Sequence, residues 1–199
     1  MISTAMFALL WLIVAANLIL TLRLTSKLRF LLDPFAAPPP VPLPAVGQPA
    51  PVFSAQTLTG KTLSLTEFAD RFITLVFVSP SCSTCRIYLP FLGRLHLLAR
   101  QVGGDLAVVV FDQGAGTRQK VERMLEEFEI KADTFIASSD HPLRLAYNPK
   151  RATPYFCHIE RGRIGATGGV GTEAWQALVR KWQNRAEQEL SHLESARHQ

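Results

Sequence analysis

The fold of this 199-residue chain is decided by the stretch FITLVFV-SPS-CSTC, which runs from Phe72 to Cys85. The apolar and β-branched run up to Val78 predicts a buried strand, and the periodic stretch 86–100 predicts a helix. Two cysteines therefore lie where a strand gives way to a helix. At a helix start, unpaired backbone N–H groups and the helix dipole favour the thiolate of Cys82. Cys85, one turn further on, is placed to displace whatever Cys82 has captured.

The same pair of cysteines also fits half of a zinc site. Tetrahedral zinc needs a second pair of ligands, usually another C-x-x-C or a close pair of histidines. The chain has only one more cysteine, Cys157, with His158 beside it. Neighbours in a strand point to opposite faces, so these two side chains do not form a second pair. The sequence favours redox chemistry over a metal site or an inert pair, and we predict neither a metal nor another cofactor.

The composition is that of a globular domain with an appendage. A hydrophobic content of 48% is enough for a sizeable core at this length. The net charge of +5 comes from basic residues scattered among acids, without a basic patch that is interleaved with aromatics. Nucleic-acid binding therefore has no support.

The appendage is at the N-terminus, where Ile2 to Leu22 contains no charged side chain. As a helix this run spans roughly 30 Å, about one bilayer core. No basic residue precedes the run and no small-x-small cleavage site follows it, which argues against a cleaved signal peptide. We therefore predict that residues 1–30 form a retained single-pass transmembrane anchor.

Two features of the chain point to opposite sides of the membrane for the domain. Arg23, Lys27 and Arg29 follow the apolar run, so the positive-inside rule places the rest of the chain in the cytoplasm. A tethered dithiol is more useful on the oxidising side, where substrates carry disulfides. We expect a protein of the bacterial inner membrane whose domain is periplasmic, against the charge rule.

The remainder of the chain divides into a linker, a domain and a tail. Residues 31–45 are rich in proline, which predicts an extended polyproline II spacer. Residues 46–185 alternate strand and helix patterns, which predicts an α/β domain of three layers, α/β/α, around a mixed sheet. The polar residues 186–199 predict a frayed tail, beginning after about Arg185.

The predicted elements of the domain follow one another at short intervals. A hairpin (53–58 and 62–65) leads into a short helix that Thr66 caps and that ends at Ala69. Arg161-Gly162 is too short to join parallel strands, so the last two strands are predicted to be antiparallel. The remaining predicted strands and helices are strands 72–78, 106–111, 134–137, 155–160 and 163–167 and helices 82–101, 117–129, 143–147 and one from Thr172.

Several motifs in this order resemble the thioredoxin superfamily. They are the segment 46–53 (VGQPAPVF), the strand that leads into C-x-x-C, Pro90 five residues after the second cysteine, and Thr153-Pro154 before a strand. The resemblance covers roughly residues 46 to 183 and is specific at the superfamily level. Within it, the chain is similar to the membrane-anchored TlpA/ResA-type branch. The segment 79–86 (SPSCSTCR) is most similar to the methylamine-dehydrogenase accessory thioredoxins (MauD-type).

The resemblance implies an activity and a set of site residues. It implies a thioredoxin fold and a protein thiol-disulfide oxidoreductase, with Cys82 as the attacking thiol and Cys85 as the resolving thiol. It makes Pro154 a cis-proline that faces the disulfide and leaves the Thr153 backbone to pair with an extended substrate. Ser83 and Thr84, between the thiols, are the other substrate-contacting positions. The implied partners are a cysteine-bearing protein substrate, an upstream membrane electron donor and the membrane itself.

Three positions depart from the family pattern. Val76 stands where thioredoxin has a buried acid, and Tyr88 stands where the TlpA/ResA branch often has glutamate. Without these bases, deprotonation of Cys85 should be slow unless water or Tyr88 assists. Ser81 replaces the usual tryptophan and is a candidate cap for the helix. These changes suit a dedicated partner better than a general reductant.

The remaining candidate residues receive no catalytic role. Cys157 is predicted to be a small buried side chain, because free cysteine is so often buried. His96, His141 and His158 have no spacing that marks ligands or a catalytic dyad. One competing function stays open: a non-catalytic thioredoxin-fold binding or assembly module, or a metal chaperone that uses the same cysteines.

Overall fold

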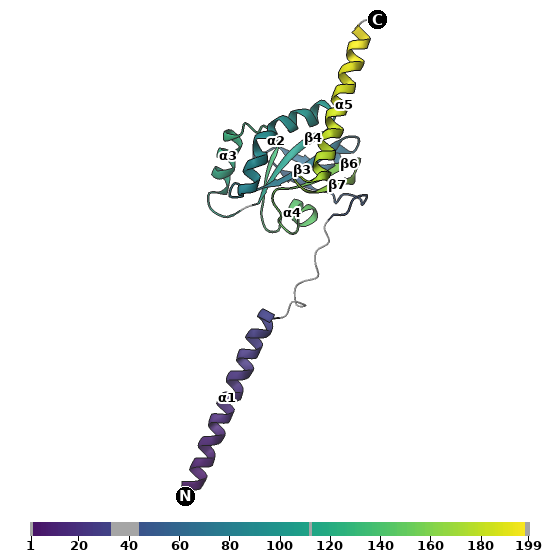
Figure 1. Ribbon diagram of the computed structural model, residues 1–199. Coiled ribbons are helices and arrows are strands. Elements are labelled where there is room, and N and C mark those ends of the chain that lie inside the picture. Colours follow the sequence, from purple (N-terminus) through teal and green to yellow (C-terminus); the bar gives the residue numbers. More distant parts are fainter. Residues whose placement is uncertain (1, 33–43, 112, 198–199) are drawn as a thin grey trace. The chain divides into compact units, whose positions relative to one another are not determined.

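A computed structural model describes residues 2–32, 44–111 and 113–197, and the chain divides into two units, residues 1–41 and 42–199 (Figure 1). The first unit consists of helix α1, Ile2–Leu32. Where its side chains are described, the large apolar ones are exposed. Among the described residues, no helix combines the length and the apolar character that a membrane span requires. The predicted anchor is therefore not confirmed, and most of the predicted linker, residues 33–43, lies outside the described residues.

The second unit is built on a five-stranded sheet in the order β5-β4-β3-β6-β7. Strand β3 is central; it pairs with β4 in parallel and with β6 antiparallel, and β5 and β7 extend the two sides. The sheet is mixed, as the sequence predicts. Its strands are β3 (Phe72–Val78), β4 (Asp105–Phe111), β5 (Thr134–Ala137), β6 (Tyr155–Glu160) and β7 (Arg163–Gly169).

Helices cover both faces of the sheet, which confirms the three-layer prediction. Three helices pack on one face: α2 (Ser83–Gln101), α3 (Thr117–Glu127) and α5 (Glu173–Arg197). The other face is covered by helix α4 (Pro142–Tyr147), the 3-10 helix η1 (Leu65–Phe68) and the hairpin of β1 (Ser54–Gln56) and β2 (Thr62–Ser64).

Two local predictions were wrong. The cap of η1 is Ser64, not Thr66: the Ser64 hydroxyl accepts a hydrogen bond from the Thr66 N–H (3.4 Å), and the Ser64 N–H donates to the Glu67 carboxylate (2.7 Å). This reciprocal capping box satisfies two backbone donors at once. The other concerns the tail, because α5 continues to Arg197 instead of fraying after Arg185. Its last turns are rich in Ala, Glu, Gln and Leu, which have high helix propensity.

Helix α5 is fixed to the sheet by large aromatic side chains. Trp182 is fully buried and stacks on Phe72 of β3, with ring centroids 5.4 Å apart. Trp175 packs edge-on against Phe156 of β6 (5.0 Å). Such pairs contribute roughly 0.5–1.5 kcal/mol beyond their buried area. The apolar stripe that the sequence shows in this helix is therefore core, as predicted.

The strand register brings three loops together at one end of the sheet, where the strands β3 and β7 end and β6 begins. Phe77 near the end of β3 lies opposite Tyr155 at the start of β6, and Tyr155 lies opposite Gly169 at the end of β7. The loop after β3, the loop before β6 and the loop after β7 therefore meet at this end. Helices α2 and α5 both begin there, and the two cysteines of the C-x-x-C lie in the first of these loops and the first turn of α2.

Candidate functional site

Cys82 is the N-cap residue of α2. Strand β3 ends at Val78, and the Ser79 carbonyl accepts a hydrogen bond from the Cys82 N–H (3.1 Å), which turns the chain into the helix. The backbone of Cys82 is extended, and its sulfur accepts a hydrogen bond from the Cys85 N–H at 3.2 Å. From the sequence, Ser81 is the candidate for this capping role. The sulfur itself takes one of the free N–H groups of the helix instead.

The surroundings of Cys82 favour its thiolate. Burial of the half-buried sulfur acts to raise its pKa, but hydrogen bonds from Cys85, from the Thr153 hydroxyl and from the Thr84 N–H outweigh this effect. The pKa of Cys82 therefore lies below that of an ordinary thiol. The positive end of the α2 dipole acts in the same direction. Cys82 thus has the properties of an attacking thiol.

Cys85 is the opposite case. Its side chain is fully buried, and burial, followed by its hydrogen bond to Cys82, raises the pKa of Cys85 to about 12. The Ser79 N–H also bonds to the Cys85 sulfur, with a smaller lowering effect. Cys85 therefore keeps its proton and donates it toward the Cys82 sulfur. The structure contains the reduced pair, with both thiols free.

A glutamine from another loop holds the residues that precede the thiols. The Gln113 side-chain amide donates to the Ser79 hydroxyl (2.8 Å) and to the Ser81 hydroxyl (3.1 Å). The Gln113 backbone is itself tied to the Thr117 hydroxyl (3.0 Å) at the start of α3. Gln113 was not predicted as a site residue. The only signal for it in the sequence is that a polar residue follows strand β4, whose carboxyl end lies at the same end of the sheet as the thiols.

The loop before β6 faces Cys82. The Thr153–Pro154 peptide bond is cis, as the resemblance implied, and the Thr153 carbonyl accepts a hydrogen bond from the Cys82 thiol (3.6 Å). The Pro154 carbonyl accepts from the Val170 N–H (3.2 Å). Fully buried Asn148 closes the loop by bonding twice to the Ala152 backbone (2.7 and 2.9 Å). Asn148 was not predicted as a site residue either.

The other predicted positions divide between surface and core. Ser83 and Thr84 are exposed at the start of α2 beside Cys82, as a contact with a substrate requires. Val76 is fully buried under the helices, and Tyr88 lies half-buried one turn beyond Cys85. The partners of the Cys85 sulfur are Cys82, Ser79 and Thr153, none of which carries a carboxylate.

The third cysteine does not belong to this site. Cys157 is fully buried, as predicted, and burial raises its pKa to about 12. It belongs to the core on the α4 face of the sheet, whereas Cys85 belongs to the core on the α2 face. It therefore cannot complete a zinc site with the pair. Within the described ranges there is no cluster of three or more side chains of the metal-binding types.

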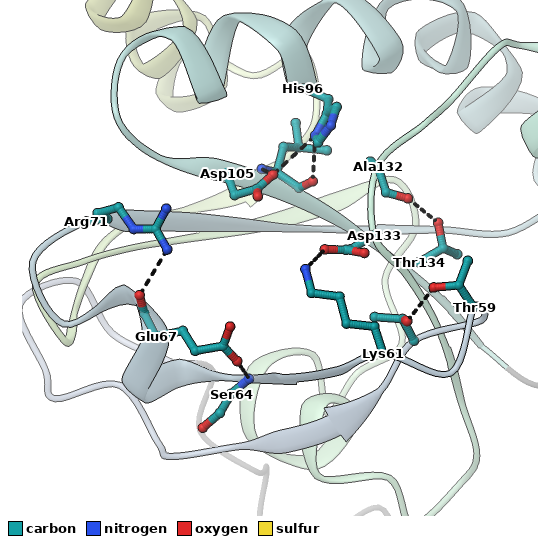
Figure 2. Close-up of polar contacts among 12 residues, drawn as sticks. Thr59, Lys61, Ser64, Glu67, Arg71, His96, Asp105, Ala132, Asp133 and Thr134 are labelled. Carbon is teal, nitrogen blue, oxygen red and sulfur yellow. Dashed lines mark hydrogen bonds and ion pairs between the residues drawn. The ribbon is translucent and has the colours of Figure 1, made fainter.

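His96, His141 and His158 have structural roles. His158 pairs with the Thr74 hydroxyl in the core (2.8 Å), and His141 accepts the Leu143 N–H (3.2 Å) at the start of α4. His96 contacts Asp105 (3.2 Å) at the end of the sheet away from the thiols (Figure 2). That end carries polar side chains that pair with one another, including Lys61 with Asp133 (2.9 Å).

Known proteins share this architecture. A thiol:disulfide interchange protein of Chlorobium tepidum superposes with a TM-score of 0.58 at 19% identity, over 71% of this chain and 98% of that one. The thioredoxin domain of a thiol-disulfide oxidoreductase from Bacteroides vulgatus gives 0.55 at 20%, over 68% and 96%. A secreted disulfide oxidoreductase of Mycobacterium tuberculosis, described as homologous to DsbE of E. coli, gives 0.53 at 16%, over 66% and 95%. These likenesses establish the thioredoxin fold.

The sequence itself identifies the family. The model of the Redoxin family matches residues 45–173, which is most of the chain, and the chain therefore belongs to the Redoxin family. No curated protein sequence matches the chain with significant similarity.

Proposed function

We propose that this protein is a thiol-disulfide oxidoreductase that acts on cysteines of a partner protein, with Cys82 and Cys85 as its catalytic residues. The observation that carries the proposal is the contrast between the two thiols. Cys82 sits at a helix N-terminus with a lowered pKa, while Cys85, hydrogen-bonded to it, has a pKa of about 12. Membership of the Redoxin family and the likeness to disulfide oxidoreductases support the same function.

The reaction proceeds in two exchanges. The Cys82 thiolate attacks one sulfur of a partner disulfide, and the other partner sulfur leaves as a thiolate. Cys85 then loses its proton, which passes to the departing thiolate through water, and attacks the Cys82 sulfur. This step forms the Cys82–Cys85 disulfide and releases the reduced partner, so two electrons have passed to it. The reverse sequence oxidises a dithiol partner.

The loop of Thr153 supports the substrate-binding role that we propose for it. In the reduced form, the Thr153 carbonyl accepts the Cys82 S–H. Once Cys82 is ionised or joined to a partner, this carbonyl loses its donor and becomes available to a backbone N–H of the partner. Pro154 leaves no competing N–H beside it, because proline has none. Exposed Ser83 and Thr84 follow Cys82 in the first turn of α2 and complete the proposed contact surface.

The decisive experiment traps the mixed disulfide. The full-length Cys85→Ser variant retains the attacking thiol but cannot resolve, so it should accumulate partners linked through Cys82. Partners are detected by non-reducing electrophoresis after mass-tagging alkylation and are identified by mass spectrometry. The Cys157→Ser variant is the matched control and should behave like the wild type. If the Cys85→Ser chain carries no partner while its Cys82 remains alkylatable, an assembly module without exchange chemistry is the better explanation.

We further propose that the domain works outside the cytoplasm, on a disulfide-bearing enzyme such as methylamine dehydrogenase. The resemblance of residues 79–86 to the accessory thioredoxins of that enzyme supports the partner, and the secreted Mycobacterium tuberculosis relative supports the side. Each reduction leaves a disulfide that needs two electrons, so the proposal includes a membrane electron donor. It does not depend on the predicted anchor. An alkaline phosphatase fused after Gln199 should be active, and an inactive fusion would contradict this placement.

A further inference from the structure

A groove of about 740 Å³ lies between α2 and α5, on the face of the sheet that also buries Cys85. Phe91, Leu95 and Leu98 line it from α2, and Trp175 and Val179 line it from α5. Phe91 is a large apolar side chain, yet 54% of it is exposed to solvent. Ligand-binding clefts have this size and this largely apolar lining.

The groove is positively charged. Arg94 and Arg180 both line it, and both are exposed. Over the described part of the chain, neither guanidinium forms an ion pair or a side-chain hydrogen bond, whereas Arg86 outside the groove pairs with Glu127 (2.6 Å). No acidic residue is among the described residues that line the groove. Two unpaired guanidiniums beside apolar side chains are complementary to an apolar ligand that carries carboxylates.

One end of the groove reaches the thiol site. Tyr88, one turn after Cys85, and Gly171 line this end. Gly171 follows Val170, whose N–H holds the carbonyl of the cis-proline at 3.2 Å. A side chain on Gly171 would meet the Tyr88 hydroxyl, since an added Cβ would lie 2.1 Å from it. The glycine therefore makes room for the tyrosine at the junction of the groove and the thiol site.

The distances suit an extended peptide. Cys82 and Tyr88 are separated by roughly 9 Å along α2, and the groove then follows α2 for about 15 Å as far as Leu98. At roughly 3.3 Å per residue, about three extended residues cover the first distance and four or five more fill the groove.

We propose that this groove binds an apolar, carboxylate-bearing segment of the partner protein, located a few residues from the cysteine that Cys82 attacks. The inference rests on the proposed exchange function and deepens it by naming what the partner must carry. The apolar side chains would bury against Phe91 and Trp175, and the carboxylates would pair with Arg94 and Arg180. A basic segment at the same place would meet two unpaired cations and be rejected.

The test compares two synthetic peptides that differ only in charge. Each contains one cysteine as a mixed disulfide with a nitrothiobenzoate reporter, a three-residue Gly/Ser spacer and an apolar segment with two Glu or two Lys. Each is made with the cysteine at either end. The full-length wild-type chain should react about tenfold faster with the acidic peptide, because two partly exposed charge pairs are gained. The readout is the ratio of the two rates, which cancels any loss of folded protein.

Charge reversal then assigns the preference to the groove. Arg94→Glu/Arg180→Glu should invert the ratio in favour of the basic peptide. Lys131→Glu/Arg161→Glu changes the net charge equally at exposed positions that do not line the groove, and it should keep the wild-type ratio. A control variant that inverts the ratio as well would show a long-range charge effect and overturn the inference.

Three further results would overturn the inference, and only one of them concerns the exchange function. Equal rates with both peptides, while the small nitrothiobenzoate disulfide is still reduced, would remove the groove proposal and leave the exchange function intact. Failure to reduce any disulfide would remove the exchange function, and with it this inference. Sedimentation velocity tests the remaining occupant: a dimer that Phe91→Asp dissociates would mean that a second copy of the chain covers the groove.

Discussion

The two ends of the central sheet use polar groups in opposite ways. At the end where β4 and β5 begin, polar side chains pair with one another, as in Lys61 with Asp133 and His96 with Asp105 (Figure 2). At the other end, hydrogen-bond donors from Cys85, Thr153 and Thr84 converge on the Cys82 sulfur. Mutual pairing stabilises the fold, whereas donors directed at one ionisable atom create reactivity. Substitutions at the thiol end should therefore change the exchange rate, whereas substitutions at the other end should leave it unchanged.

Replacing the attacking sulfur should have the largest effect. Cys82→Ala should reduce exchange with protein disulfides to the background rate, because the remaining thiol of Cys85 is buried and has a pKa of about 12. Reduction of insulin, followed by turbidity, measures the loss. Cys157→Ala removes a thiol from the other face of the sheet and should retain the wild-type rate. Substantial activity in Cys82→Ala would mean that the two thiols are not divided as described.

Breaking the glutamine bridge should have the next largest effect. Gln113→Ala leaves the Ser79 and Ser81 hydroxyls without their amide donor, and two lost hydrogen bonds should lower the free energy of unfolding by about 1–2 kcal/mol. Because Ser79 also bonds to Cys85, insulin reduction should slow by roughly severalfold. Urea unfolding and the same turbidity assay measure the two effects. Gln119→Ala, at an exposed position on α3, is the matched control.

Removing one donor from the sulfur should have a smaller, pH-dependent effect. Thr153→Val deletes a hydroxyl that lowers the pKa of Cys82, so this pKa should rise by up to about one unit, whereas Thr153→Ser should preserve it. The pH dependence of Cys82 alkylation by iodoacetamide reports the midpoint. Unchanged midpoints in both variants would show that the hydroxyl does not act on the sulfur.

The sign of the accompanying stability change follows from the lowered pKa. Ionised Cys82 is favoured in the folded state, so its contribution is fully present above the pKa of an unfolded thiol and is lost as the pH falls through the folded pKa. The difference in unfolding free energy between the wild type and Thr153→Val should therefore widen toward alkaline pH.

At the other end of the sheet, the expected effect is the smallest. Asp133→Asn breaks an ion pair whose lysine side chain is 55% exposed, so it should cost less than about 1 kcal/mol in urea unfolding. The rate of insulin reduction should not change. If Asp133→Asn slowed the reaction as Gln113→Ala does, the proposed separation between the two ends would be wrong.

The strands and most helices could be predicted from local sequence. The run from Phe72 to Val78 is fully apolar apart from one threonine, and the structure forms β3 over these residues. Arg161-Gly162 permits only a tight turn, so β6 and β7 are antiparallel neighbours as predicted. Buried periodicity and turn length are properties of a short segment, which is why they can be read without the fold.

The residues that support the site could not be predicted in this way. Gln113 and Asn148 act on groups that only the fold brings close, such as the Ser79 hydroxyl and the loop before Thr153. The predicted helix caps, Thr66 and Ser81, were also wrong. Ser64 and Cys82 have the extended backbone that an N-cap requires, and the side chains of their neighbours are equally suitable, so the sequence does not distinguish them. The positions of Cys82 at the helix start and of Cys85 in the first turn could be predicted, because the C-x-x-C follows directly on an apolar strand.

Burial of the odd cysteine has a consequence for how the chain matures. Three sulfurs permit three different intramolecular cross-links, and an oxidising environment forms wrong ones as readily as right ones. Here the β-sheet separates the cysteines: Cys157 is buried on one face, and Cys82 and Cys85 lie on the other. Once folded, the chain can close only one intramolecular disulfide, the one between Cys82 and Cys85.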